Sequence, residues 1–385
     1  MKNEAIAFLV LVLLLPLHCA DPFTPELEGS DQLLVVEGTI TNAPGPYFVK
    51  LSSTTAIEHP FPLPVKGATV VLSEQDGPAE TLTETEPGTY ATSAWGIQGE
   101  AGKKYKIAIL LPDGREYESA YEEIPQPEAI DSVYAEVDSR TDPAYTYPLR
   151  GYQFYLDASV QHQESKYFLW KLTETYKFNS DLLIPYYYAG QLLPFPKPDS
   201  LFTCYKTSDV KDIFVLDAER LETPQVRRYP LHFVDTEGRK LFLKYSLLVE
   251  QYVVGKEAFA FWSHIKRQNT GLGALYTTQP FQIRGNISNV GDPEEAVLGY
   301  FMAAGYAERR LFVERPPGVE FHFGVCTIGE PEIYEMLGLS RTRPSTWPIY
   351  LGQSPDGGPM GVPDQVCADC RQKKATIEKP GFWID

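Results

Sequence analysis

Four of the five cysteines lie in the second half of the chain and are the residues most able to form covalent cross-links. They are Cys204, Cys326, Cys367 and Cys370. In an exported protein, such an even number is typical of two disulfides, for which three pairings are open. The short spacing of the last two also allows a redox pair or part of a zinc site. Disulfides are favoured, because a redox pair should begin a helix after a strand and a four-cysteine zinc site usually has two close pairs.

The fifth cysteine, Cys19, follows a segment with the pattern of an export signal. Lys2 provides a charged start and residues 5–15 are uniformly apolar, but this run is shorter than the roughly twenty residues that span a bilayer. A cysteine directly after such a run is typical of lipid attachment. We therefore predict a cleaved signal peptide over 1–18, with Cys19 as the lipid-attachment residue and 19–30 as anchor and tether. Ordinary secretion is the alternative.

Paired carboxylates are the candidates for hydrolytic chemistry. Glu122-Glu123 and Glu294-Glu295 could serve glycoside hydrolysis if the fold held two carboxylates about 5–10 Å apart across a cleft. Solvated turn acids are the simpler interpretation. The histidines lack metal-ligand spacing, and the sequence has neither a nucleophile elbow nor a glycine-rich phosphate loop. We therefore predict a protein that is not an enzyme, with no catalytic residue, metal or cofactor.

An aromatic stretch over 179–203 is the best candidate for contact with a ligand or partner. It contains several prolines and no clear period, so a long loop is expected. The candidate contact residues are Tyr186, Tyr187, Tyr188 and Phe195. Exposed tyrosines offer an apolar face and a hydroxyl at low entropic cost, which suits a sugar, a peptide or the rim of a membrane barrel. Alternatively, these side chains fill a gap between domains.

The elements that position these residues are predicted to be mainly strands. Short β-branched or alternating runs separated by Gly, Pro and Asp over 31–125 are typical of an immunoglobulin-like β-sandwich. The prolines of 124–127 form a linker. Residues 126–385 should form a larger β-rich domain, with a hairpin joining strands 228–234 and 241–252.

One amphipathic helix is expected in the second domain. Over 256–267, Ala258, Phe261, Trp262 and Ile265 fall on one face, and Gly271 follows as a stop. This face should pack on the sheet.

The formal net charge of -17 limits the choice of partners. Nucleic-acid binders need a basic surface that displaces counterions, so this class is excluded. Binding to an anionic membrane through charge is excluded as well, so a membrane contact would depend on the lipid at Cys19.

A set of motifs distributed along most of the chain, in this order, resembles the Bacteroidota-type lipoprotein family known as domain of unknown function 4249. The motifs that carry the resemblance lie at 34–38, 65–70, 130–134, 244–252, 256–262, 279–287, 297–301, 367–370 and 379–383. The resemblance implies a lipid-anchored protein of the outer membrane and does not indicate which of the two leaflets carries it. Such proteins are commonly encoded beside a TonB-dependent receptor. The resemblance implies no reaction.

These observations together predict an accessory or cargo-binding partner of an outer-membrane receptor barrel in nutrient uptake. A stand-alone surface protein that binds a glycan or peptide is the alternative. A hydrolase with an unrecognised carboxylate pair is the third hypothesis.

Overall fold

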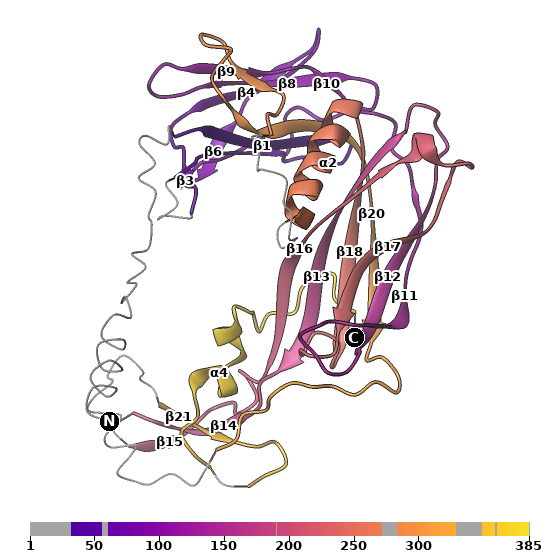
Figure 1. Ribbon diagram of the computed structural model, residues 1–385. Coiled ribbons are helices and arrows are strands. Elements are labelled where there is room, and N and C mark those ends of the chain that lie inside the picture. Colours follow the sequence, from indigo (N-terminus) through magenta and orange to yellow (C-terminus); the bar gives the residue numbers. More distant parts are fainter. Residues whose placement is uncertain are drawn as a thin grey trace, which may run out of the picture.

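The computed structural model describes residues 32–55, 61–189, 191–271, 283–328, 349–358 and 360–384. The predicted signal peptide over 1–18, the lipid-attachment residue Cys19 and the tether lie outside these residues. The described part is mainly β, which confirms the predicted fold class. A β-sandwich, a long upright wall of strands and a small tail module follow one another in space, as Figure 1 shows.

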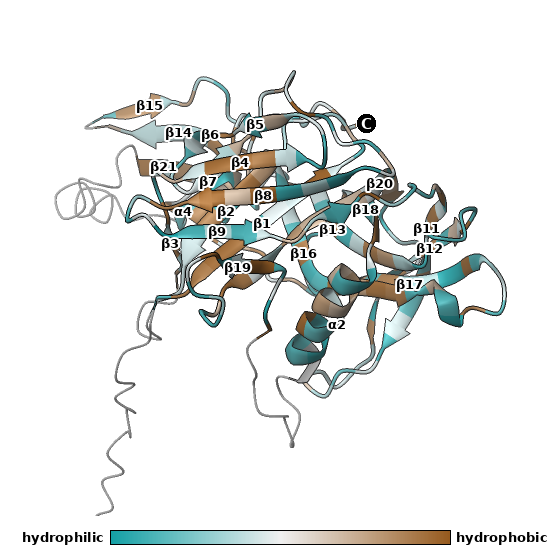
Figure 2. Cartoon of the chain, turned by 90° about the horizontal axis from the view of Figure 1, so that it is seen from above, coloured by the Kyte–Doolittle hydropathy of each residue, from teal (hydrophilic) through white to brown (hydrophobic). Residues whose placement is uncertain are grey.

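The N-terminal sandwich has two facing sheets. Its first sheet contains β1 (Leu34–Thr41), β2 (Phe48–Ser53), β3 (Leu63–Pro64), β6 (Thr83–Glu86) and β7 (Thr89–Ala91). Its second sheet contains β4 (Thr69–Glu74), β5 (Ala79–Thr81), β8 (Lys104–Leu110), β9 (Glu116–Ser119), β10 (Glu122–Glu123) and β19 (Ile287–Asn289). Alternate residues of each strand enter the core, as Tyr105, Ile107 and Ile109 do in β8. Figure 2 shows the resulting hydrophobic stretches along β4 and β8.

The sandwich takes strands from beyond the predicted domain boundary at residue 125. β19 pairs with β9, and the first half of β20 (Leu298–Glu314) runs parallel to β1. The second half of β20 pairs with a strand of the wall instead. One continuous strand therefore belongs to both parts, and a single sheet extends from the wall into the sandwich.

The wall consists of two sheets and one helix. Its strands are β11 (Ile130–Arg140), β12 (Leu149–Ser159), β13 (Tyr167–Asn179), β16 (Thr203–Asp217), β17 (Gln225–Asp235) and β18 (Lys244–Val254), with a 3-10 turn η1 (Ala218–Arg220) after β16. The order β16-β13-β18-β20 forms the main sheet, and β11-β12-β17 packs on one face of it. β17 and β18 thus lie in different sheets, so the predicted hairpin between them is wrong.

The helix α2 (Lys256–Gly271) covers the opposite face of the main sheet. Ala258 and Phe261 are buried there against Leu169 and Met302, and Trp262 and Ile265 are partly buried beside them. The predicted helix and its apolar face are therefore confirmed. Its position beneath the sandwich fills part of the inner corner between the two modules (Figure 1).

The aromatic stretch over 179–203 differs from the predicted loop. Its backbone forms β14 (Leu183–Tyr188) and β15 (Leu192–Pro194), and β21 (Ile349–Gln353) completes a small antiparallel sheet. The tail adds α4 (Gln365–Ala368) and a 3-10 turn η3 (Cys370–Lys373). The backbone of β14 forms hydrogen bonds with β21, which is distant in the sequence, and the local sequence of 179–203 does not indicate this pairing.

The four downstream cysteines form two disulfides, as predicted, and the structure selects one of the three pairings. Cys204 of β16 is bonded to Cys370, and Cys326 is bonded to Cys367. The two neighbours in the CxxC motif therefore bind different partners, which excludes the redox pair and the zinc site for them. Each bond attaches the tail to a segment far away in the sequence.

We expect thiol titration of the unfolded, non-reduced protein to detect none of these four cysteines. All four sulfur atoms are held in these two bonds, and a disulfide sulfur does not react as a thiol even when the chain is unfolded. Titration after reduction is the control and should expose all four. Reactive thiols before reduction would contradict the pairing.

Candidate functional site

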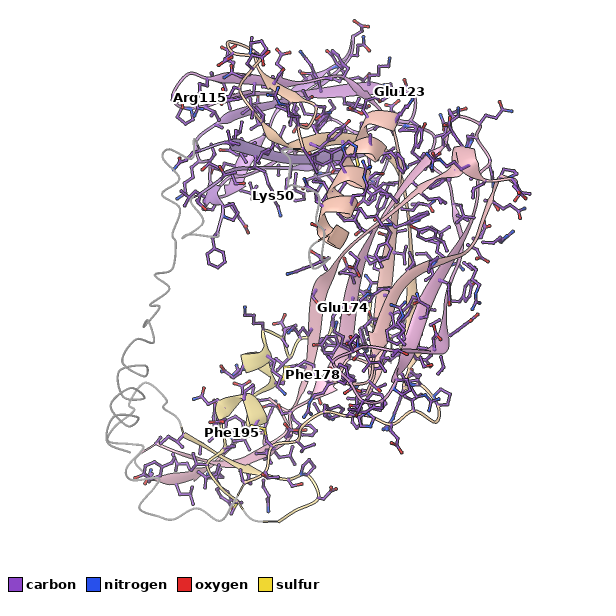
Figure 3. The ribbon with its side chains drawn as sticks, in the orientation of Figure 1. Lys50, Arg115, Glu123, Glu174, Phe178 and Phe195 are labelled. Atoms are coloured by element: carbon purple, nitrogen blue, oxygen red, sulfur yellow. A yellow bond between two sulfur atoms is a disulfide. The ribbon has the colours of Figure 1, made fainter. Side chains whose placement is uncertain are left out.

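A cavity of about 1070 Å³ lies in the inner corner of the molecule, where the sandwich, the wall and α2 meet. The side chains that matter most for its chemistry are Glu37, Lys50, Lys171, Glu250, Tyr252, Trp262, Tyr306 and Glu308. Figure 3 shows Lys50 on the side of the sandwich that faces the corner, beside α2. The cavity therefore has walls from segments far apart in the sequence.

Strand alternation explains which side chains reach the cavity. In β1, Val36 and Ile40 are buried in the sandwich core, so Glu37 and Thr39 project from the other face. In β20, Phe301 is likewise committed to the sandwich core, and its neighbours line the corner. The amphipathic pattern that builds the sandwich therefore also supplies one wall of the cavity.

Charged side chains form a row across the wall sheet at the floor of the cavity. Lys171 of β13 is paired in register with Glu250 of β18, which is paired in turn with Glu308 of β20. Two residues along the strands, Tyr252 and Tyr306 form a neighbouring cross-strand pair. Cross-strand neighbours are close enough to interact, so acids and hydroxyls meet on this floor.

The two acids on the floor accept hydrogen bonds from the tyrosines. The Tyr252 and Tyr306 hydroxyls each donate a hydrogen bond to Glu250 Oε1, with an oxygen–oxygen distance of 3.2 Å in both cases. The Tyr306 hydroxyl also contacts Glu308 Oε2. Burial, reinforced by these carboxylates, raises the pKa of both tyrosines well above the ordinary range. Their hydroxyls stay protonated and remain donors to the acids.

Lys171 has a different environment from the acids beside it. Its Nζ lies 5.3 Å from the ring centroids of both Tyr252 and Trp262. Within the described ranges, it has no hydrogen-bond acceptor and no carboxylate oxygen within 4.0 Å. Burial lowers its pKa, an effect that outweighs the attraction of Glu250 and Glu37. The floor therefore holds a largely desolvated amine whose described close neighbours are aromatic.

Trp262 contributes a second donor without a partner. Its Nε1 is buried and finds no acceptor in the described part of the chain. Buried indole N–H groups usually have one. Two unpaired donors on adjoining walls distinguish this corner from an ordinary packed core.

The aromatic residues predicted from the sequence lie in the tail module, away from the cavity (Figure 3). The Phe195 ring packs against Tyr187 and Tyr350, with centroid distances of 6.2 and 5.6 Å, at the edge of a small core. Tyr186 is exposed, whereas Tyr188 is half-buried. At least two of the four candidates therefore take part in local packing, and among these tyrosines only Tyr186 is exposed.

The carboxylate pair Glu122-Glu123 is divided between two faces of β10, as successive strand residues are. Glu122 is buried and accepts hydrogen bonds from the Tyr300 hydroxyl at 2.6 Å and from Asn286 Nδ2 at 3.0 Å. Burial raises its pKa. Glu123 lies 3.8 Å from Lys104 instead. Glu122 thus connects the sandwich to Tyr300 of β20, and Glu122 and Glu123 do not face each other.

The second acidic pair is also divided. Glu295 accepts a hydrogen bond from the Tyr117 hydroxyl at 2.8 Å and lies 3.3 Å from Arg115. Glu294 is placed by its backbone N–H, which donates to Asp292. Glu295 therefore fastens the segment before β20 to the second sheet of the sandwich.

A further buried acid, Glu174, lies in the lower half of the wall (Figure 3). It binds Lys240 Nζ at 2.6 Å, the Tyr245 hydroxyl at 3.0 Å and the Ser208 hydroxyl at 3.0 Å. His232 Nε2 is 4.0 Å away, which is too long for a hydrogen bond. The ammonium compensates the buried carboxylate, so this cluster is a satisfied structural network.

The described residues also bear on metal binding and membrane insertion. No group of three or more His, Cys, Asp or Glu among them could hold a metal ion. No helix among them has the length and apolar character needed to cross a membrane.

The sequence contains one signal for the corner cavity. Lys171 interrupts a strand whose neighbours Leu169, Trp170 and Leu172 are all fully buried. A lysine in the middle of such a buried apolar run is unusual and needs a partner or a function. The other walls come from β1, β20 and α2, and no local pattern indicates that these elements meet.

Comparison with known proteins gives one family match. The model of a family described as a domain of unknown function, DUF4249, matches residues 20–310. This segment contains every described residue that lines the corner cavity, whereas three of the four disulfide cysteines lie beyond it. No curated protein matches the chain.

Proposed function

The chain belongs to the DUF4249 family, and we propose that it is a non-enzymatic lipoprotein of the cell envelope that binds cargo in the corner cavity. It would act as an accessory partner of a TonB-dependent receptor in the outer membrane. The observation that carries the proposal is the corner cavity itself. A volume of about 1070 Å³ is near the upper end of small-ligand sites, roughly 300–1,000 Å³.

The construction of the cavity supports binding. Ligand sites combine apolar and aromatic walls with a few polar groups that orient the ligand. Here Phe48, Phe261 and Met302 supply apolar surface, and Lys171 supplies a donor that no described residue uses. Because the acids at the floor already accept hydrogen bonds from tyrosines, the arrangement favours recognition over proton transfer.

Membrane attachment is the second part of the proposal. Residues 20–33 can span at most about 50 Å when extended, so a lipid on Cys19 would hold the sandwich near the membrane. We expect Cys19→Ala to move the protein from the membrane fraction of broken cells to the soluble fraction, because the acyl chains would be lost. Immunoblotting of the two fractions measures this. An unmodified Cys19 in the mature wild-type protein, detected by mass spectrometry, would contradict the lipid anchor.

Filling the cavity tests its role in binding cargo. Thr39→Trp places a large side chain into the cavity from β1, where aromatic residues are well tolerated. We expect glycans or peptides that raise the melting temperature of the wild type to have no effect on the melting temperature of this variant. Thr69→Trp, on an exposed face of β4, is the matched control and should respond like the wild type. An equal response of both variants would exclude the cavity as the cargo site.

Copurification in mild detergent tests the receptor. Recovery of the tagged wild type without any outer-membrane barrel would contradict the accessory role. Ligand binding by the isolated protein would then support a stand-alone binder of glycans or peptides. That alternative has one observation in its favour, because a single chain provides all walls of the cavity.

A further inference from the structure

We propose that the corner cavity selects ligands that join an anionic oxygen group to an apolar or aromatic body, with the anion held by Lys171. This inference rests on the proposed function, since it names the ligand class for the same cavity. Carboxylates, sulfonates and phosphates share the required chemistry.

The first argument is the state of Lys171. Lys171 is half-buried, and removing an ammonium group from water without an ion-pair partner is costly. Lys171 has two aromatic faces and no oxygen acceptor in the described ranges. Burial lowers its pKa, in agreement with this deficit. An anion in the cavity would supply the missing acceptor through a charge-assisted hydrogen bond.

The second argument is that the two acids on the floor of the cavity are engaged by tyrosines. Glu250 accepts hydrogen bonds from two tyrosine hydroxyls, and Glu308 is contacted by Tyr306. Glu37, on the sandwich side, is the cross-strand neighbour of Lys50, but the described structure shows no ion pair between them. None of these three acids forms an ion pair with Lys171 in the described structure. The fixed positions of these strands hold the carboxylates off the ammonium group and leave its place for a ligand.

The third argument is the surface around Lys171. Trp262 and Tyr252 flank the ammonium group, and Ile265 and Met302 extend the apolar lining. Phe48 on the sandwich side is 49% exposed and adds apolar surface to the lining of the cavity. These side chains favour a planar or aliphatic body adjacent to the anion.

Two fluorescent probes with the same aromatic body test the inference. 8-Anilinonaphthalene-1-sulfonate carries the anion, and N-phenyl-1-naphthylamine lacks it. We expect the wild type to bind both, and the sulfonate more tightly by at least about tenfold, as one charge-assisted hydrogen bond provides. Lys171→Met should remove this preference and leave the affinity for the neutral probe within about twofold, since the apolar walls remain.

Matched variants separate a local effect from a general one. Lys50→Met removes an exposed cation that also lines the cavity, and it should change the affinity for the sulfonate much less than Lys171→Met does. Thr39→Trp should weaken the binding of both probes, because the tryptophan side chain would occupy part of the cavity. Because methionine replaces a half-buried charge that has no ion-pair partner among the described residues, the Lys171→Met variant should melt no earlier than the wild type.

The probes distinguish failure of the anion selectivity from failure of the cargo site. Sulfonate affinity that survives Lys171→Met, or falls together with that of the neutral probe, overturns the anion selectivity and leaves the cavity as a binding site. Failure of both probes to bind, or binding that Thr39→Trp does not affect, overturns the proposed cargo site itself.

Discussion

Gly299→Ala should lower the free energy of unfolding by about 3 kcal/mol or more, because this position combines a left-handed backbone with a close contact. Gly299 has a φ of +87°, and a Cβ there would lie 2.0 Å from the Val36 carbonyl oxygen. The two residues are direct partners in the parallel pairing of β20 with β1. A methyl group would therefore force apart the strands that join the sandwich to the wall.

Gly114→Ala provides the matched control for this experiment. Gly114 has a φ of +90°, but nothing lies within 4 Å of the Cβ that alanine would add. It should therefore show only the backbone penalty, about 1–2 kcal/mol. Denaturant unfolding followed by tryptophan fluorescence measures both variants. Equal losses at the two positions would show that the contact between β20 and β1 is not the cause.

Local patterns were sufficient for the elements themselves. The helix over 256–267 followed from the spacing of Ala258 and Phe261, and both are buried in the structure. Alternation in 104–109 similarly gave the central strand of the second sandwich sheet. In each case the period of the apolar residues reflects one buried face, which is a property that a short segment carries by itself.

Long-range pairing was not available from the same patterns. β20 is one continuous strand that changes partners from β1 to β18 after Ala304. The turn near Glu237 likewise leads into another sheet instead of closing a hairpin. Alternation fixes which face of a strand is buried, but it does not specify which neighbour provides the hydrogen bonds.

The same limit applies to the candidate sites. The aromatic stretch is conspicuous because its residues are adjacent in sequence, yet β14 and β15 fold it onto β21 at the tail. The corner cavity combines Glu37, Lys171 and Trp262, which are separated by long stretches of chain. Only Lys171 carries a local signal, as a charged residue within the apolar run 168–172. Its importance becomes visible once the structure shows that Glu250 and Glu308 are engaged by tyrosines.

Removing the Cys204–Cys370 disulfide should have the other large effect on stability. The bond closes a separation of 166 residues and connects β16 to η3. Loss of a native disulfide typically costs about 2–5 kcal/mol, and in the chain-entropy model the cost rises with loop length. Both sulfur-bearing residues are fully buried beside Phe178, so the double variant Cys204→Ala/Cys370→Ala also loses packing at this point.

The second disulfide supplies the comparison. Cys326–Cys367 closes a separation of only 41 residues, so the variant Cys326→Ala/Cys367→Ala should lose about 1 kcal/mol less through chain entropy. Thermal unfolding of the two double variants, with limited proteolysis to follow the tail, measures the difference. Because Cys204 is part of the wall sheet, loss of its bond should release the tail from the wall and expose the last residues to protease. A tail that stays protected without this bond would show that the contacts of Trp383 with Tyr205 and Phe312, rather than the covalent link, hold it in place.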